Sequence, residues 1–247
     1  MQQPPRHILV LGDASRPKVK AAVARALPLL RRALPRVSVA LTNSRRPPAG
    51  TDAALVFGGA GAVLRAARLL APRGIPLLGV NLGKLGFLTE ADEREIPALA
   101  RRLAAGRLQE IQAPMLACSL LRGRRRRALG LALNDAVIGS GGIARMTVLD
   151  LSVDGRAVAR YPGDGLIVAT PSGSTAHSLS AGGPILAPGV SALAITPIAP
   201  HTLSQRALLL PSEARTGWPG WAEIVLTVVL TIFMVNFAIP LPVGEGS

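Results

Sequence analysis

The stretch VFGGAGAVLRAARLL, residues 56–70, decides the fold of the first part of the chain. It predicts a buried strand that breaks at a Gly-Gly-Ala-Gly turn and continues directly into a helix. Such a turn exposes backbone N–H groups at the start of the helix, and these groups favour a bound anion. Gly58, Gly59 and Gly61 are therefore a candidate phosphate loop. The alternative is a glycine turn that serves packing alone.

Alternating strands and helices extend from this loop in both directions. Apolar runs predict strands at residues 7–13, 37–43, 53–57 and 75–81. Helical spacing predicts helices at residues 18–32, from the glycine loop to residue 74, and at residues 93–105. Thr89 and Asp92 stand at capping-box spacing before the last helix. This alternation is typical of a doubly wound parallel sheet, so residues 1–112 are predicted to form a Rossmann-like α/β domain.

The pattern changes after residue 113, where short β-rich runs replace the helices. These runs lie at residues 115–121, 131–139, 146–155, 166–170 and 192–198. No long helical pattern separates them, so residues 113–211 are predicted to form a β-rich domain. Asp154 and Gly155 predict a tight hairpin turn. The arginine-rich residues 122–127 are interpreted as a solvated hairpin tip, with a nucleic-acid patch as the alternative.

The charge balance narrows the class of partner. The chain has 28 Lys and Arg against 14 Asp and Glu, a net charge of +14, which favours anionic partners such as nucleotides or polyphosphate. A GC-rich gene would give the same excess of arginine. Aromatic residues make up only 3% and the arginines are scattered, so nucleic-acid binding is not expected. Cys118 is the only cysteine and no secretory signal is visible, which favours a reducing, cytoplasmic location.

A second candidate site lies in TPSGSTAHSLSAGG, residues 170–183, which follows a predicted strand. Its hydroxyls, glycine amides and single imidazole suit hydrogen bonding to a nucleotide. His177 has no cysteine or nearby histidine companion, so no metal site is predicted here. Asn134, Asp135 and Asp164 add short polar groups at strand ends, suited to ribose hydroxyls or an amide. A Ser/Gly loop with a purely structural role is the alternative.

Three segments together resemble the NAD kinase family: residues 79–89, 164–184 and 196–204. The resemblance implies phosphorylation of the 2′-hydroxyl of the adenosine ribose of NAD, which gives NADP. It also implies an α/β N-terminal domain, a β-rich C-terminal domain and a nucleotide site in the cleft between them. ATP or polyphosphate would be the phosphoryl donor, with Mg²⁺ or another divalent metal. The family commonly forms dimers and tetramers.

The resemblance also implies roles for particular residues. Gly61 would face the nucleotide phosphates, and Asn134 and Asp135 would lie on the ribose and nicotinamide side. Arg145 falls where the family often has a basic or polar ligand-binding residue, and Asp164 matches the family's Asp-Gly pair. The adenosine-binding segment matches Thr175, Ala176, His177, Ser178 and Ser180. His177 stands where the family usually has tyrosine.

Ala60 departs from the family, whose loop reads Gly-Gly-Asp-Gly. The resemblance assigns the catalytic role to that Asp, so no catalytic side chain is intact at this position. A positioned general base contributes about 10²- to 10⁴-fold in rate, and a methyl group supplies none of it. The alternative to an active NAD kinase is therefore a catalytically impaired NAD(P)-binding protein.

The apolar residues 212–247 are a second departure, because the motif match ends near Pro211. Three interpretations stay open for this segment. It is a membrane anchor through residues 222–239, a strand or helix that packs on the β-rich domain, or the product of a degraded gene. The first would make the protein a membrane-tethered nucleotide sensor.

Overall fold

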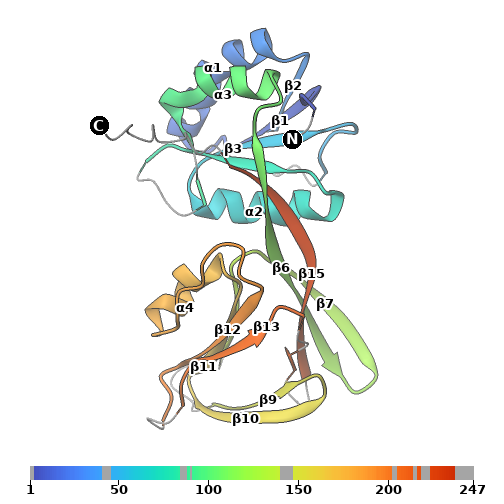
Figure 1. The fold of residues 1–247 in the computed structure, drawn as a ribbon, viewed down its shortest axis with the longest axis vertical. Helices are drawn as coiled ribbons and strands as arrows, with labels where there is room; N and C mark the ends of the chain where they lie inside the picture. The colour runs from blue at the N-terminus through green and yellow to red at the C-terminus, as the bar shows by residue number, and fades with distance from the viewer. Residues whose placement is uncertain are drawn as a thin grey trace, which may run out of the picture. The chain divides into compact units, whose positions relative to one another are not determined.

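The computed structural model describes residues 3–40, 46–83, 88–89, 91–139, 147–201, 205–213, 216–217 and 223–236. The chain divides into two compact units (Figure 1). The first is Met1–Ile111 together with Phe233–Ser247, and the second is Gln112–Ile232.

The first unit is built on parallel strands. These are β1 (His7–Leu11), β2 (Arg36–Ala40), β3 (Ala53–Phe57), β4 (Leu77–Asn81) and β5 (Ala91–Asp92), in the spatial order β2-β1-β3-β4-β5. Every residue of β1, β3 and β4 is buried. Strands that are buried on both faces read as continuous apolar runs, and this explains why HILVL, AALVF and LLGVN show no alternation.

Helices cover both faces of this sheet (Figure 1). Helices α1 (Pro17–Ala33) and α3 (Ile96–Ala104) lie on one face, and α2 (Ala60–Leu70) lies on the other. Pro17 occupies the first turn of α1, where its missing N–H is not needed. After α2 a short 3₁₀ turn (Ala71–Arg73) ends at the left-handed Gly74. Apolar residues of α1 and α3 pack on alternate side chains of β1, β3 and β4, such as Ile8, Val10, Leu55 and Val80.

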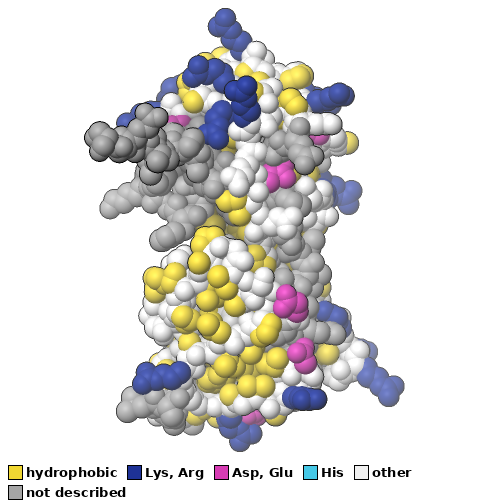
Figure 2. All heavy atoms as spheres, in the orientation of Figure 1, with side chains coloured by type: hydrophobic (Ala, Val, Ile, Leu, Met, Phe, Trp, Pro, Cys, Tyr) yellow, Lys and Arg dark blue, Asp and Glu magenta, His cyan; other side chains and the backbone are white. Residues whose placement is uncertain are grey.

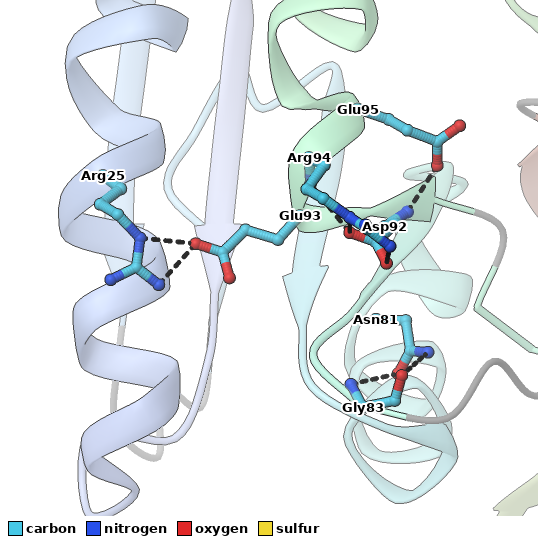
Figure 3. A network of polar contacts seen from close by, with 7 residues as sticks. All are labelled: Arg25, Asn81, Gly83, Asp92, Glu93, Arg94 and Glu95. Atoms are coloured by element: carbon cyan, nitrogen blue, oxygen red, sulfur yellow. Dashed lines mark hydrogen bonds and ion pairs between the residues drawn. The ribbon is translucent and has the colours of Figure 1, made fainter.

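The capping box lies three residues later than the sequence spacing predicts. The Asp92 carboxylate accepts a hydrogen bond from the N–H of Arg94 at 2.9 Å, and Glu95 Oε2 accepts one from the N–H of Asp92 at 2.7 Å (Figure 3). Asp92 is thus the cap and not the third residue of a helix capped by Thr89. The predicted helix 93–105 begins as a 3₁₀ turn (Glu93–Glu95) before α3. Glu93 also pairs with Arg25 of α1 at 2.6 Å, which ties the two helices together.

The second unit is antiparallel. One sheet has the order β13-β12-β11-β8, formed by β8 (Asp135–Gly139), β11 (Gly165–Ala169), β12 (Ala192–Ile198) and β13 (Leu208–Pro211). Two hairpins are β6–β7 (Gln109–Arg122 and Arg125–Ala132) and β9–β10 (Thr147–Val153 and Arg156–Gly163). Both predicted hairpin turns are confirmed, with Arg122 paired to Arg125 and Asp154 in a left-handed conformation at φ 49°.

The two faces of the β8–β11–β12–β13 sheet bury different partners. One face packs with the hairpins around Leu116, Leu151, Tyr161, Leu166 and Leu193. Burial raises the pKa of the Tyr161 hydroxyl. The other face presents Ile167, Ala169 and Ala194 to Leu186 and Ala181, which belong to the segment that follows β11. The predicted fold class, an α/β domain followed by a β-rich domain, is confirmed.

The described part of the apolar tail is a strand, β15 (Glu223–Asn236). It pairs with β14 (Thr216–Gly217), with β6, and in parallel with β4 at Met234 and Leu77. Residues 237–247 lie outside the described part of the chain. Among the residues that the structure describes, no helix has both the length and the apolar character needed to cross a membrane.

Substitution of Asp92 tests the observed capping box. Asp92→Ala removes the side-chain acceptor at the start of the 3₁₀ turn Glu93–Glu95 that leads into α3, and loss of such a cap costs about 1 kcal/mol. We expect a lower urea midpoint and a free energy of unfolding reduced by about this amount. Glu93→Ala is the matched control, because a solvent-accessible ion pair contributes about 0–1 kcal/mol. An unchanged midpoint for Asp92→Ala would contradict the assigned cap.

Candidate functional site

The glycine loop lies at the carboxyl end of β3, beside the carboxyl end of β1. In the order β2-β1-β3-β4-β5 the chain reverses direction across the sheet between β1 and β3. Ligands of doubly wound sheets bind at such a reversal, outside the carboxyl ends of the two strands. Gly58 is buried with φ 149°, a conformation that favours glycine, and a Cβ there would lie 2.8 Å from Cβ of Ala62. Gly59, Ala60 and Gly61 are exposed at the loop tip.

The first turn of α2 leaves the N–H groups of Ala60 and Gly61 available to an anion, while that of Ala62 donates to the Gly59 carbonyl at 2.9 Å. Gly59 is the N-cap residue and offers no side-chain hydrogen bond, and the first turn has no acidic residue. The start of an eleven-residue helix carries a partial positive charge. Arg65, one turn further along α2, has its Nη1 3.8 Å from the Cβ position of Gly61. The loop therefore combines free amides with a guanidinium group, which suits phosphate oxygens.

Asp13 follows β1 at the same edge of the sheet. Its Oδ1 accepts hydrogen bonds from the N–H of Ser15 at 3.0 Å and from the Ser15 hydroxyl at 2.6 Å. Its Oδ2 lies 3.6 Å from Nε of Arg16. The bonds from Ser15, followed by the charges of Arg16 and Arg65, lower the pKa of the Asp13 carboxyl. Asp13 is thus an ionised group close to the charge of Arg65.

The second unit holds the other candidate residues around Asn134 and Asp135. Asn134 precedes β8, and its carbonyl accepts the N–H of Thr170 at 2.9 Å. The Thr170 hydroxyl donates to the carbonyl of Leu133 at 2.6 Å, and so fixes the end of β11 against the start of β8. Gly173 approaches the Asn134 backbone so closely that any Cβ there would overlap with it. This packing places the 170–183 segment beside Asn134 and Asp135.

Two side-chain oxygens at this place have no hydrogen-bond partner within the described residues. Asn134 Oδ1 and Asp135 Oδ2 are both buried and accept no hydrogen bond. An unpaired buried acceptor costs about 1–3 kcal/mol, so acceptors of this kind point to a ligand that donates hydrogen bonds. Nδ1 of His177 lies 3.5 Å from Asp135 Oδ2, and the two form an ion pair only when the imidazole is protonated.

Two protein families match the chain over most of its length. The ATP-NAD kinase N-terminal domain matches residues 22–108, and the ATP-NAD kinase C-terminal domain matches residues 133–228. The chain belongs to the NAD kinase family. The C-terminal match continues past Pro211, where the sequence motifs end, and so includes part of the apolar segment.

Curated NAD kinases are similar to the chain over part of their length. The NAD kinase of Koribacter versatilis is 48% identical over 161 residues, which cover 65% of this chain and 56% of the relative. The NAD kinase of Gemmatimonas aurantiaca is 45% identical over 181 residues, 72% of this chain and 63% of the relative. The chain thus spans less than two thirds of the length of these relatives.

Solved structures of NAD kinases share the fold. Yeast NADH kinase complexed with NADH superposes with a TM-score of 0.82 at 23% identity, over 96% of this chain and 85% of that one. An NAD kinase from Archaeoglobus fulgidus in complex with ATP gives a TM-score of 0.70 at 26% identity, over 94% of this chain and 93% of that one.

The structure gives different surroundings to the residues that the family resemblance singles out. Thr175 and Ala176 are half-buried, while Asp164, His177 and Ser180 are exposed. Ser178 is fully buried, and its hydroxyl bonds to that of Thr196 at 2.8 Å. The Ser178 side chain therefore holds the 170–183 segment against β12. Arg145 lies outside the described residues.

Two residues near the glycine loop escape the sequence motifs. Neither Asp13 nor Arg65 belongs to the three segments that carry the family resemblance, although Arg65 lies in the stretch 56–70. The signal for Asp13 is a polar residue at the end of the first predicted strand. Whether Asp13 lies near the glycine loop depends on which strand pairs with β1. The sequence of one strand does not reveal which strands are its neighbours in the sheet.

The described residues contain no group of three or more His, Cys, Asp or Glu side chains that could hold a metal ion. Mg²⁺ usually binds to substrate phosphates, one or two carboxylates and water, so it does not require such a group. The donor set of the glycine loop, which has amides and a guanidinium, fits the phosphates of a metal–nucleotide complex.

Gly173→Ala tests the close contact between Gly173 and the Asn134 backbone, which places the 170–183 segment beside Asn134 and Asp135. The added Cβ would overlap with backbone atoms of Asn134, which cannot move away without breaking the bonds to Thr170. Overpacking of this kind costs about 1–3 kcal/mol or more, so we expect a clearly lower melting temperature. Ser172→Ala, next to it in the same turn, is the control and should melt like the parent protein. Equal melting of all three proteins would show that the contact is not close.

Proposed function

We propose that this protein transfers the γ-phosphoryl group of ATP to the 2′-hydroxyl of the adenosine ribose of NAD, giving NADP. The observation that carries the proposal is the match of both NAD kinase domains to one chain. The named relatives are NAD kinases, and nothing among them favours a protein that only binds NAD(P).

The two candidate sites suit the two substrates. The free amides of the glycine loop and Arg65 would bind phosphate oxygens, as a triphosphate donor requires. We propose ATP, and not polyphosphate, as the phosphoryl donor because the Archaeoglobus fulgidus relative was solved in complex with ATP. Mg²⁺ bound with the nucleotide would neutralise charge on its phosphates. The buried oxygens of Asn134 and Asp135 would accept hydrogen bonds from ribose hydroxyls or a carboxamide of NAD.

Self-association forms part of the proposal. Hydrophobic side chains gather on the second unit in the face that Figure 2 shows. Large exposed apolar residues of this unit include Leu179, Ile185 and Val190, and Ile185 is 64% exposed. We propose that the protein forms a dimer or tetramer through such residues in the cytoplasm. Light scattering coupled to gel filtration measures the assembly.

NADP formation from NAD, ATP and Mg²⁺ tests the proposed reaction directly. We expect turnover by the parent protein and a KM for NAD raised about tenfold to a hundredfold in Asp135→Ala. This range corresponds to the loss of hydrogen bonds to a charged group, about 1.5–3 kcal/mol. Asp150→Ala, which removes an exposed carboxylate bonded to Arg160 in the same unit, is the control.

Comparison with Ala60→Asp separates the proposal from its alternative. NAD binding is measured first for both proteins by calorimetry. Turnover by the parent protein supports the proposed function. If both bind NAD and only Ala60→Asp forms NADP, the natural protein is the catalytically impaired NAD(P)-binding protein.

A further inference from the structure

Phosphoryl transfer to a hydroxyl group requires a side chain that orients the hydroxyl and accepts its proton. The glycine loop has only the methyl group of Ala60 at its exposed tip. We propose that Asp13, on the neighbouring strand, supplies this carboxylate. The inference rests on the proposed function and assigns a catalytic residue within it.

The register of the sheet places Asp13 beside the loop. Strands β1 and β3 are parallel neighbours, with Leu11 opposite Val56. Two residues further along each strand, this register brings Asp13 opposite Gly58. Adjacent strands lie about 4.8 Å apart, so the Asp13 backbone comes within one side-chain length of the loop. The β1–β3 reversal described above is also the expected ligand position in such a sheet.

The Asp13 carboxylate has one oxygen held and one oxygen accessible. Ser15 donates two hydrogen bonds to Oδ1 and fixes the orientation of the group. Oδ2 makes the longer, 3.6 Å contact with Arg16, and the Asp13 side chain is 37% exposed. A carboxylate that is fixed through one oxygen and partly exposed is suited to accept a hydrogen bond from a substrate hydroxyl.

Arg65 connects the carboxylate with the phosphate loop. Its Nη1 lies 3.8 Å from the point where a Cβ added to Gly61 would lie. The bonds from Ser15 lower the pKa of Asp13 most, and the charges of Arg16 and Arg65 lower it further. The carboxylate is therefore ionised at neutral pH and can accept a hydrogen bond from a substrate hydroxyl. The same guanidinium is placed to offset negative charge on a phosphoryl group at the loop.

Other described carboxylates of the first unit are engaged elsewhere. Asp52 accepts the N–H groups of Arg6 and His7 at the start of β1, which is the opposite edge of the sheet. Asp92 and Glu95 form the capping box, and Glu93 pairs with Arg25 (Figure 3).

The step balances with the substrates of the proposed reaction. The 2′-hydroxyl oxygen of NAD forms a bond to the γ-phosphorus of ATP. The bond from that phosphorus to the β,γ-bridging oxygen breaks, and its electron pair leaves with ADP. The hydroxyl proton passes to Oδ2 of Asp13 and from there to solvent.

The test compares Asp13→Asn with Asp150→Asn. Asparagine keeps an oxygen that accepts from Ser15, so the loop after β1 is retained, but it cannot take a proton. We expect kcat to fall about 10²- to 10⁴-fold in Asp13→Asn with little change in KM for NAD or ATP. Asp150→Asn, which alters an exposed carboxylate bonded to Arg160, should keep the parental kcat.

A second variant tests whether a carboxylate at position 60 can replace that of Asp13. The double variant Asp13→Asn with Ala60→Asp restores a carboxylate at the loop, and we expect it to regain much of the lost kcat. Parental kcat in Asp13→Asn would overturn the inference and leave the proposed function intact. NAD binding without turnover in the parent protein would instead overturn the proposed function, and the inference with it.

Discussion

Burial of β1, β3 and β4 on both faces is the constraint on which the first unit depends. Apolar strands of this kind need helices on each side, and α1, α3 and α2 supply them. Connections through helices make all strands run in the same direction, so their carboxyl ends meet at one edge. Gly58 and Asp13 lie together there for that reason, although 45 residues separate them along the chain.

The second unit depends on close backbone packing in place of helix–sheet layers. Thr170 and Gly173 hold the end of β11 against Asn134, and no side chain larger than hydrogen fits at Gly173. Beside this contact, side-chain oxygens of Asn134 and Asp135 are buried without a hydrogen-bond partner in the described residues. Stability given up at such atoms is commonly recovered when a ligand donates the missing hydrogen bonds.

Ala60 shows that the side chain at the tip of the glycine loop is not what sets the shape of the loop. The turn requires glycine at Gly58, where φ is 149°, but position 60 is exposed and tolerates any small residue. Binding of phosphate by backbone amides does not depend on that side chain. Proton transfer needs a side chain, and at the edge of a parallel sheet a neighbouring strand can present one.

The sequence by itself determined the alternation of strands and helices in the first part of the chain, the β-rich character of the part that follows, the hairpin turns and the family, because apolar periodicity, glycine turns and motif spacing are local properties. It also identified Asn134, Asp135 and the 170–183 segment as polar groups at strand ends. Tertiary structure decided which of these polar groups are available to a ligand and which are bonded within the protein. Ser178 carries the same hydroxyl as Ser180, yet packing turns it inward to Thr196. Asp92 caps a helix because Glu95 lies within reach, and Asp13 gains its position only from the pairing of β1 with β3. Strand neighbours and burial arise from contacts between distant residues, and local sequence patterns do not encode them.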